Sequence, residues 1–315
     1  MKKNYPGIDI FKFLFACLIP LLHINFGTVP AVDFIRQYIS RLGVPFFFAA
    51  SGFFLSHSIK NRGAAAALLR HESRVGKLLL VWLIIYSPLL FSSVLDGFFP
   101  WQEVLFKTPA YLWYLTALLV AAIPFCLIRN RKLLWNISFL LYIAGTLISE
   151  SYDWLTGGFP GYTNIFLTTR NGIFFGLPIL CVGEICGHNP VSSQKKQSIL
   201  LLLSTVALFA EITFVGNHAS AEADRSMYLF LPAFTYSLFR FAMNFNVPYD
   251  TSFIWGASTA IYLTQFGFIC VSSIIMNFFA VSTLSWNWLT YLILIVGGCV
   301  IYRLSRGNRI LKHLF

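Results

Sequence analysis

The chain has 315 residues, of which 57% are hydrophobic and only 11% are charged. A soluble domain carries about twice this share of charged residues, so the composition excludes an ordinary soluble protein. The hydrophobic residues form runs of about 20, the length at which a helix crosses the hydrocarbon core of a bilayer. We therefore predict an all-α fold, a polytopic transmembrane helical bundle that forms a single domain over residues 1–315.

The formal net charge of +11 does not indicate a nucleic-acid partner. The basic residues fall in short segments between hydrophobic runs, where Lys and Arg orient the spans of a membrane protein. The six cysteines lie in hydrophobic segments, and no Cys/His spacing is that of a metal site. We therefore expect the lipid bilayer as a partner, and we expect no nucleic acid, no disulfide framework and no metal.

The hydrophobic runs predict about ten transmembrane spans. The predicted spans are 8–26, 43–59, 78–99, 110–128, 133–149, 172–187, 199–216, 228–245, 253–276 and 287–303. Most of the 23 basic residues then fall on the same side as the N-terminus, and the even number of spans returns the C-terminus to that side. By the positive-inside rule, both termini are predicted to be cytoplasmic.

The first predicted span carries three ionisable residues, Asp9, Lys12 and His23. Eleven steps of about 100° bring a helix back to within roughly 20° of the same face, about 16 Å further along. We therefore predict Lys12 and His23 on one stripe of one helix, with Asp9 placed to pair with Lys12. Ionisable groups inside a bilayer mark functional sites, and a neutral imidazole is the usual general base. An interfacial ion pair, plus a histidine that hydrogen-bonds a neighbouring helix, is the structural alternative.

In the second predicted span, Pro45 and the pair Ser51-Gly52 interrupt a run of phenylalanines and alanines. Small residues in a membrane helix allow another helix or a ligand to approach its backbone closely. We favour close helix packing at this position over direct chemistry by Ser51.

The segment before the third span is the most basic of the chain. Arg70, Arg74 and Lys77 are spaced at i, i+4 and i+7, which predicts one face of a helix that enters the span. On charge alone, two interpretations are balanced. The segment either orients the chain and contacts anionic lipid, or it binds the phosphates of a cytoplasmic cofactor.

Further candidates lie at the outer ends of spans and inside them. Trp113 and Tyr114 open the fourth span, and Arg170 precedes the sixth. The two aromatic residues are typical either of an interfacial belt or of a surface that orients a sugar acceptor. Glu184 and Glu211 are intramembrane acids, which are functional candidates by default.

Taken together, these residues resemble acyltransferase family 3 of integral membrane proteins over nearly the whole chain. The matching segments are Gly7-Ile8-Asp9, Lys12 with His23, Val44-Pro45-Phe46-Phe47-Phe48, Ser51-Gly52-Phe53, the basic segment, Trp113-Tyr114-Leu115, and Arg170 with Phe175-Gly176. Two positions depart from the family. Lys12 stands where arginine is normal, and Gln265 stands where many members have histidine. A glutamine forms hydrogen bonds but cannot relay a proton.

The resemblance implies about ten transmembrane helices and a cytoplasmic acyl-CoA donor, usually acetyl-CoA. The acyl group passes to a hydroxyl of an extracytoplasmic or lipid-linked glycan. By the same resemblance, the catalytic candidates are Lys12 and His23, and the cofactor-binding candidates are Arg70, Arg74 and Lys77. A narrower resemblance, carried by Arg170-Asn171-Gly172 and the stretch 224–228, is to the membrane half of vancomycin-resistance serine racemases. That branch is associated with supplying serine.

We therefore predict an acyl-CoA-dependent O-acyltransferase that performs O-acetylation in the cell envelope, as a multi-pass protein of the bacterial inner membrane. The predicted substrate-binding residues are Trp113, Tyr114, Arg170 and Glu184. The alternative is a carrier or binding protein for a small polar molecule such as serine. That alternative explains Lys12 and Gln265 better, and the basic segment less well. The acceptor, the acyl length and a homo-oligomeric state stay open.

Overall fold

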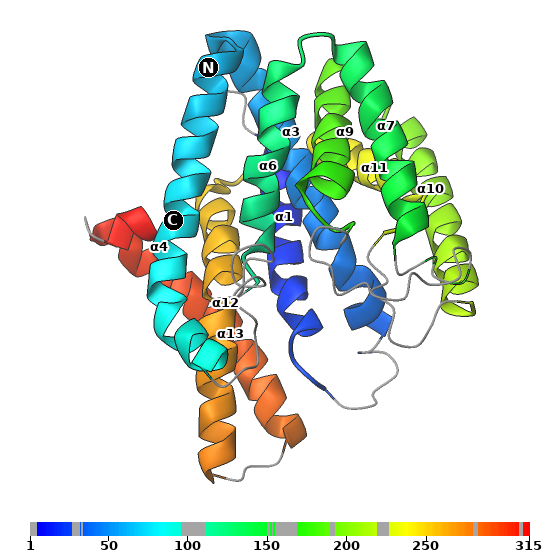
Figure 1. Ribbon diagram of the computed structural model, residues 1–315. Coiled ribbons are helices and arrows are strands. Elements are labelled where there is room, and N and C mark those ends of the chain that lie inside the picture. The colour runs from blue at the N-terminus through cyan, green and yellow to red at the C-terminus, as the bar shows by residue number, and fades with distance from the viewer. Residues whose placement is uncertain are drawn as a thin grey trace. The chain divides into compact units, whose positions relative to one another are not determined.

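The computed structural model is all-helical (Figure 1), with ten α-helices and no strand among the residues that it describes. These residues are 5–26, 32, 34–95, 111–149, 152, 154, 169–189, 193–218, 227–279, 283–308 and 311–315. The α-helices are α1 (Pro6–Leu18), α3 (Gly43–Arg62), α4 (Ala64–Leu95), α6 (Trp113–Leu127), α7 (Arg131–Ile148), α9 (Leu177–His188), α10 (Gln194–Gly216), α11 (Leu231–Asn244), α12 (Ser252–Phe279) and α13 (Thr283–Gly307). Short 3-10 or π turns are η1 (Ile19–Leu22), η2 (Ile35–Ile39), η3 (Ser40–Leu42), η6 (Gly172–Gly176) and η7 (Leu311–Leu314).

Each predicted span overlaps one of these helices, which confirms the all-α prediction. Within the described ranges, four helices are long and apolar enough to cross a membrane: Ser40–Arg62, Gln194–Gly216, Ser252–Phe279 and Leu284–Gly307. The number of spans and the side of the termini stay predictions. Residues 96–99 of the third predicted span and residue 110 of the fourth lie outside the described residues.

The prediction that one continuous helix covers 8–26 is wrong. The helix α1 ends at Leu18, and the chain continues as the 3-10 turn η1, which contains Pro20. Proline has no N–H for the α-helical hydrogen bond and clashes with the carbonyl four residues earlier. With 3.0 residues per turn beyond Leu18, His23 lies about 120° around the axis from Lys12 and not on the same stripe.

The described chain divides into two compact units. Unit 1 comprises Met1–Val44, Leu80–Tyr86 and Phe245–Phe315, and unit 2 comprises Pro45–Leu79 and Ser87–Asn244. Unit 1 therefore holds α1, α12 and α13, and unit 2 holds most of α3 and α4 together with α6, α7, α9, α10 and α11. The single domain over 1–315 stays a prediction.

In unit 1, α12 packs along both α1 and α13 (Figure 1). Small residues allow α12 and α13 to approach closely, because a Cβ added at Gly298 would lie 2.8 Å from the Ile261 side chain. Asp9 contacts Thr251, and Lys12 contacts Trp255, so α1 and α12 run in the same direction. This orientation agrees with the predicted topology, in which the first and ninth spans both leave the cytoplasm.

In unit 2, α3 and α9 cross with their backbones in direct contact. A Cβ added at Gly52 would lie 2.0 Å from the Leu180 carbonyl oxygen, and one added at Gly183 would lie 1.9 Å from the Ala49 carbonyl oxygen. The predicted close packing at Ser51-Gly52 is therefore confirmed. The aromatic core of the unit includes fully buried Phe46, Phe48, Phe53, Phe125, Phe175 and Phe239.

We expect Gly52→Ala and Gly183→Ala to destabilise the protein by at least about 1–3 kcal/mol, the usual cost of overpacking. The added methyl group meets backbone atoms, which cannot turn aside as a flexible side chain can. Thermal unfolding of the purified protein in detergent measures the effect. Gly76→Ala in α4 is the matched control, because a Cβ there has no heavy atom within 4 Å and alanine favours a helix. Equal unfolding temperatures for Gly52→Ala and Gly76→Ala would contradict the close crossing.

Candidate functional site

The catalytic candidate Lys12 lies in unit 1 between α1 and α12. Its Nζ atom lies 5.1 Å from the centroid of the Trp255 ring, a cation–π arrangement. Asp9 is 7% exposed; its Oδ2 accepts a hydrogen bond of 2.6 Å from the Thr251 hydroxyl, and its charge interacts with that of Lys12. Asp9 and Lys12 are therefore close enough for their charges to interact, as predicted. Thr251 and Trp255 are additional partners that the sequence did not reveal.

The second catalytic candidate, His23, follows η1 directly and is half-buried. Its backbone N–H donates to the Pro20 carbonyl at 3.0 Å, which closes the turn. On both sides of His23, the buried side chains Leu21, Ile24 and Phe26 form a small apolar cluster, against which Ile269 of α12 packs. The structure thus places His23 beside α12. Its catalytic role and that of Lys12 stay predictions.

In unit 2, the structure brings together Trp113 and Arg170, two of the predicted substrate-binding residues. The Arg170 guanidinium carbon lies 4.8 Å from the centroid of the Trp113 ring. Asn171 holds the backbone beside this pair, because its Oδ1 accepts hydrogen bonds from the N–H groups of Ile173 and Phe174 at 2.8 and 3.0 Å. Arg170 is exposed, so the stacked pair presents a polar, planar surface at this end of the unit.

Tyr114, the third of these residues, points into the bundle instead. Its hydroxyl and the Ser51 hydroxyl lie 3.1 Å apart, and its ring packs edge-on against Phe48. The charge of Arg74 acts on the Tyr114 hydroxyl through space, more weakly than burial and the Ser51 hydrogen bond do. Binding of substrate by Trp113, Tyr114 and Arg170 stays a prediction.

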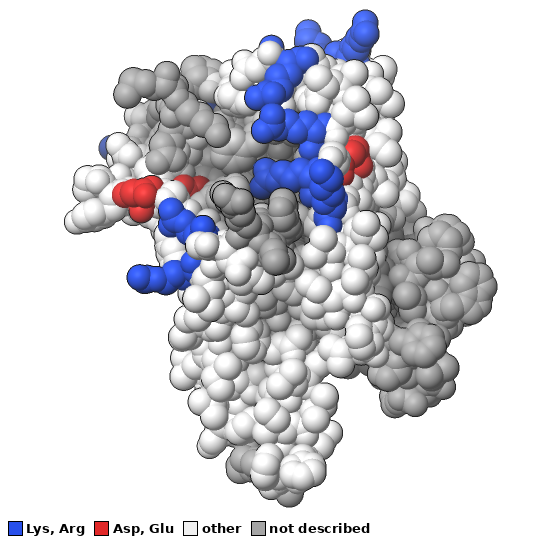
Figure 2. Space-filling view, turned by 90° about the vertical axis from the view of Figure 1, so that its left-hand side faces the viewer, with Lys and Arg blue, Asp and Glu red and all other residues white. Residues whose placement is uncertain are grey.

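The basic segment is helical, as predicted. The helix α3 ends at Arg62, Gly63 reverses the chain with φ +83°, and α4 then runs without a break from Ala64 to Leu95. Glycine suits this turn because side chains disfavour a positive φ. Arg70, Arg74 and Lys77 are all exposed. Figure 2 shows Lys and Arg side chains gathered on one part of the molecular surface.

Two ionisable residues of the basic segment are partly buried. His71 Nε2 and Glu72 Oε1 are buried atoms that have no hydrogen-bond partner among the described residues. Burial, together with the nearby charge of Arg74, lowers the pKa of His71 to about 4. Burial also raises the pKa of Glu72 above its usual value. His71 is therefore a neutral imidazole at neutral pH, held inside a positively charged surface.

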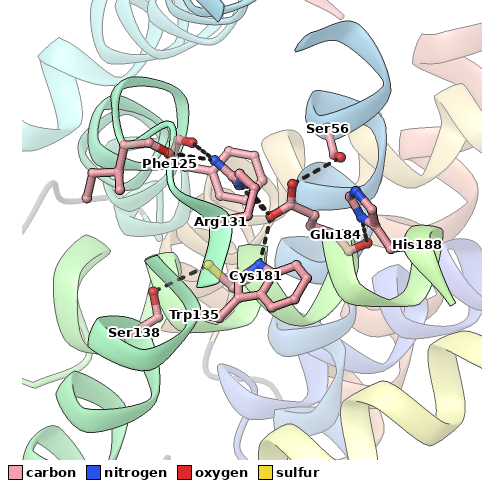
Figure 3. Close-up of polar contacts among 9 residues, drawn as sticks. Ser56, Phe125, Arg131, Trp135, Ser138, Cys181, Glu184 and His188 are labelled. Atoms are coloured by element: carbon pink, nitrogen blue, oxygen red, sulfur yellow. Dashed lines mark hydrogen bonds and ion pairs between the residues drawn. The ribbon is translucent and has the colours of Figure 1, made fainter. Parts of the chain in front are cut away.

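The fourth predicted substrate-binding residue, Glu184, lies apart from the other three. Its carboxylate forms an ion pair with Arg131 and accepts hydrogen bonds from Trp135 Nε1 at 3.0 Å and the Ser56 hydroxyl at 3.3 Å (Figure 3). Arg131 also donates to the Phe125 and Ile128 carbonyls at the C-terminal end of α6. This network ties α3, α6, α7 and α9 together.

Through Arg131, Glu184 is therefore linked to the end of α6 that is opposite to Trp113, the first residue of that helix. Substrate binding by Glu184 stays a prediction, and its contacts favour a structural role. The sequence contained a signal for this partner. Arg131 is the first residue of the helix that follows α6, and Glu184 is linked to that same end of α6. Glu211, the other intramembrane acid, accepts from the Tyr152 hydroxyl and from the N–H groups of Leu229 and Phe230 before α11.

Four of the described helices are long and apolar enough to cross a membrane. Residues 5–304 match the family model described as an acyltransferase domain. The chain therefore belongs to this acyltransferase family, as its resemblance predicted. No group of three or more His, Cys, Asp or Glu side chains in the described part of the chain could hold a metal ion.

Three curated relatives are racemases by name. An amino-acid racemase of Enterococcus faecalis is 29% identical over 272 residues, covering 78% of this chain and 37% of the relative. A serine/alanine racemase of Enterococcus gallinarum is also 29% identical over 272 residues, covering 79% of this chain and 38% of the relative. The chain thus spans less than two fifths of these relatives, and residues 224–226 of the narrower resemblance lie outside the described residues. No solved structure matches the chain.

We expect Glu184→Gln to lower the stability of the protein by about 1–3 kcal/mol, because Arg131 loses its charged partner. Binding of the acceptor should not change if Glu184 is structural. Thermal unfolding measures the first effect, and the KM for the acceptor measures the second. Arg131→Gln and the double variant complete a thermodynamic cycle, in which the two losses should not add. Wild-type stability with a raised KM would show instead that Glu184 binds substrate.

We expect His71 to make stability depend on pH. The pKa of about 4 in the folded protein is below the usual value of 6.5, so the unfolded chain binds a proton that the folded protein excludes. Stability should therefore fall as pH decreases from about 6.5 to about 4, by on the order of 1–2 kcal/mol at pH 5. His71→Gln should flatten this part of the profile of unfolding temperature against pH. His218→Gln, at an exposed position, is the control; equal slopes for wild type and His71→Gln would exclude the effect.

Proposed function

We propose that this membrane acyltransferase takes its acyl group, in the simplest case acetyl, from a cytoplasmic acyl-CoA and transfers it to a hydroxyl of an extracytoplasmic or lipid-linked glycan. The observation that carries the proposal is the exposed basic face of α4, where Arg70, Arg74 and Lys77 precede the apolar part of the same helix. Membership of the acyltransferase family supports the reaction class. The donor, the acceptor and the bacterial inner membrane as the location belong to the proposal.

The basic face suits the phosphates of coenzyme A, which carries a diphosphate and a 3′-phosphate. An arginine binds two phosphate oxygens at once through its planar fork, and a lysine acts as a point charge. Arg74 has a second role in this proposal, because its charge also interacts with the Tyr114 hydroxyl inside unit 2. A cation in that position draws the phosphate end of the donor towards the helices, and the acyl-pantetheine arm then extends along them.

In the transfer step, His23 takes the proton of the acceptor hydroxyl while the hydroxyl oxygen attacks the thioester carbonyl. The carbon–sulfur bond breaks, the ester forms, and the leaving thiolate of coenzyme A receives the proton from the imidazolium. General-base catalysis of this kind is worth about 10²–10⁴-fold in rate. Lys12 stays beside Asp9 and over the Trp255 ring, where it supplies positive charge without exchanging a proton.

The stacked pair of Arg170 and Trp113 supports a glycan acceptor. An aromatic ring offers a flat apolar face to the C–H groups of a sugar ring, and an exposed guanidinium offers several hydrogen-bond donors to its hydroxyls. Both side chains lie at the end of α6 away from Arg131, which the predicted topology places outside the cytoplasm.

A second candidate function is a carrier or binding protein for a small amino acid such as serine. The names of the curated relatives favour it, and the buried Gln265 can bind a polar ligand without relaying a proton. This function leaves the basic face of α4 without a ligand.

Binding and transfer assays on the protein in nanodiscs distinguish the two functions. We expect acetyl-CoA to bind, and we expect Arg70→Ala or Arg74→Ala to weaken binding by about tenfold each, the effect of losing one charge-assisted contact. Lys132→Ala, an exposed basic residue of α7, is the matched control and should bind like wild type. His23→Ala should bind acetyl-CoA normally but transfer radiolabelled acetyl to envelope fractions about 10²–10⁴ times more slowly.

Equal loss of binding in Lys132→Ala would show that acetyl-CoA responds to the overall positive charge of the protein and not to a specific site on the basic face of α4. Unchanged transfer by His23→Ala would remove His23 from the reaction. Uptake of labelled serine by proteoliposomes, without affinity for acetyl-CoA, would favour the carrier.

A further inference from the structure

The side chain of Gln265 is the most unusual polar group of unit 1. It is only 1% exposed, and neither Nε2 nor Oε1 has a hydrogen-bond partner among the residues that the structure describes. A buried amide that forms no hydrogen bond is costly, so such groups are rare unless something else binds them. The adjacent Thr264 is also buried, but its hydroxyl donates to the Ala260 carbonyl at 2.8 Å. Of these two neighbouring residues, only Gln265 therefore has buried side-chain atoms without a hydrogen-bond partner among the described residues.

Gln265 lies on the face of α12 that packs along α1. Thr251 contacts α1, and Ile269 packs against the cluster of Leu21, Ile24 and Phe26, which flank His23 in the sequence. At 100° per residue, Gln265 is within about 40° of both Thr251 and Ile269 around the helix axis. The amide therefore points towards α1 and η1.

The alignment of α1 with α12 also places Gln265 at nearly the same position along the helix axes as His23. Lys12 lies beside Trp255, and the two helices run in the same direction. Six α-helical and five 3-10 steps carry the chain about 19 Å from Lys12 to His23, and ten α-helical steps carry it about 15 Å from Trp255 to Gln265. The difference is less than one helical turn.

The surroundings of Gln265 favour a neutral ligand group. Its neighbours on α12 include Ile261, Leu263 and Phe266, and the Tyr86 hydroxyl is already bound to the Leu263 carbonyl at 2.6 Å. A charged ligand group would need a counter-charge in such an apolar setting. An amide offers N–H donors and a carbonyl acceptor together, which matches a hydroxyl whose neighbouring carbon bears a second hydrogen-bond donor.

We propose that Gln265 is the residue that binds the acceptor in unit 1. Its N–H group donates to the oxygen of the reacting hydroxyl, and its carbonyl accepts from the donor on the next carbon. The ligand class is an uncharged vicinal diol or N-acylated amino alcohol, which is the chemistry of a sugar, and binding of a charged β-hydroxy amino acid is left as an outcome of the test. This inference rests on the proposed function, because it supplies the acceptor contact beside His23. Since Gln265 is closed off in the structure, ligand entry requires neighbouring side chains to move.

The test compares Gln265→Met, which keeps the length of the side chain without its amide, with Thr264→Val as the matched control. Unfolding temperatures are measured without ligand and with two probes, N-acetylglucosamine and L-serine. Without ligand, Gln265→Met should unfold at a higher temperature than wild type, because it removes an unpaired buried amide. N-acetylglucosamine, which is uncharged, should stabilise wild type and Thr264→Val but not Gln265→Met, whereas stabilisation by L-serine alone would overturn the assignment of a neutral ligand group.

In transfer assays with N-acetylglucosamine, Gln265→Met should raise the KM about tenfold, the effect of losing one to two buried hydrogen bonds, while acetyl-CoA binds as in wild type. A lower unfolding temperature for Gln265→Met without ligand would overturn the inference, because the amide would then have a structural partner. Stabilisation by neither probe, or equal stabilisation of Gln265→Met, would overturn it too. Probe binding that depends on Gln265, without any acyl transfer by wild type, would reject the proposed function and keep the binding site.

Discussion

Polar side chains inside an apolar helical body need partners, and this constraint organises the structure. In unit 2, Arg131 and Glu184 are each other's charged partners. Their ion pair and its hydrogen bonds link four helices. Glu211 satisfies the same constraint by accepting from the backbone before α11, and Arg240 does so by donating to carbonyls at the end of α9. Each pairing joins segments far apart in the chain. These groups are costly to bury alone, so the pairings also fix which helices are neighbours.

Against this background, the groups that lack partners become informative. The described residues satisfy the buried acids Asp9, Glu184 and Glu211, but they leave the Gln265 amide and one atom each of His71 and Glu72 without hydrogen bonds. Two of these residues lie in the basic segment of α4, and the third lies on α12 near the cluster of Leu21, Ile24 and Phe26. These three groups thus lie in the segments to which we assign the proposed donor and acceptor contacts, where a ligand can complete the hydrogen bonds.

The sequence predicts the helices well because each depends on a local run of hydrophobic residues. It also predicts close helix packing at Ser51-Gly52 and the helical basic segment, since both follow from local spacing, although it does not identify α9 as the partner. The break after Leu18 was visible as Pro20, but hydrophobicity continues through it, so one helix was predicted. Local patterns did not identify Arg131 as the partner of Glu184, although its position was a signal, or Thr251 as a partner of Asp9. They are 53 and 242 residues away, and only the fold brings them together.

Lys12 stands where the family normally has arginine. This difference affects which residues are suited to bind phosphate and which are suited to bind the acceptor. An ammonium group over the Trp255 ring, with Asp9 nearby, already has its charge compensated twice within unit 1. Lysine also lacks the planar fork that binds two phosphate oxygens at once. Lys12 is therefore better suited to hold a fixed positive charge beside α12 than to clamp a phosphate. Under the proposed function, phosphate recognition then rests on the exposed guanidinium groups of α4, and the polar contacts near His23 are left to the acceptor.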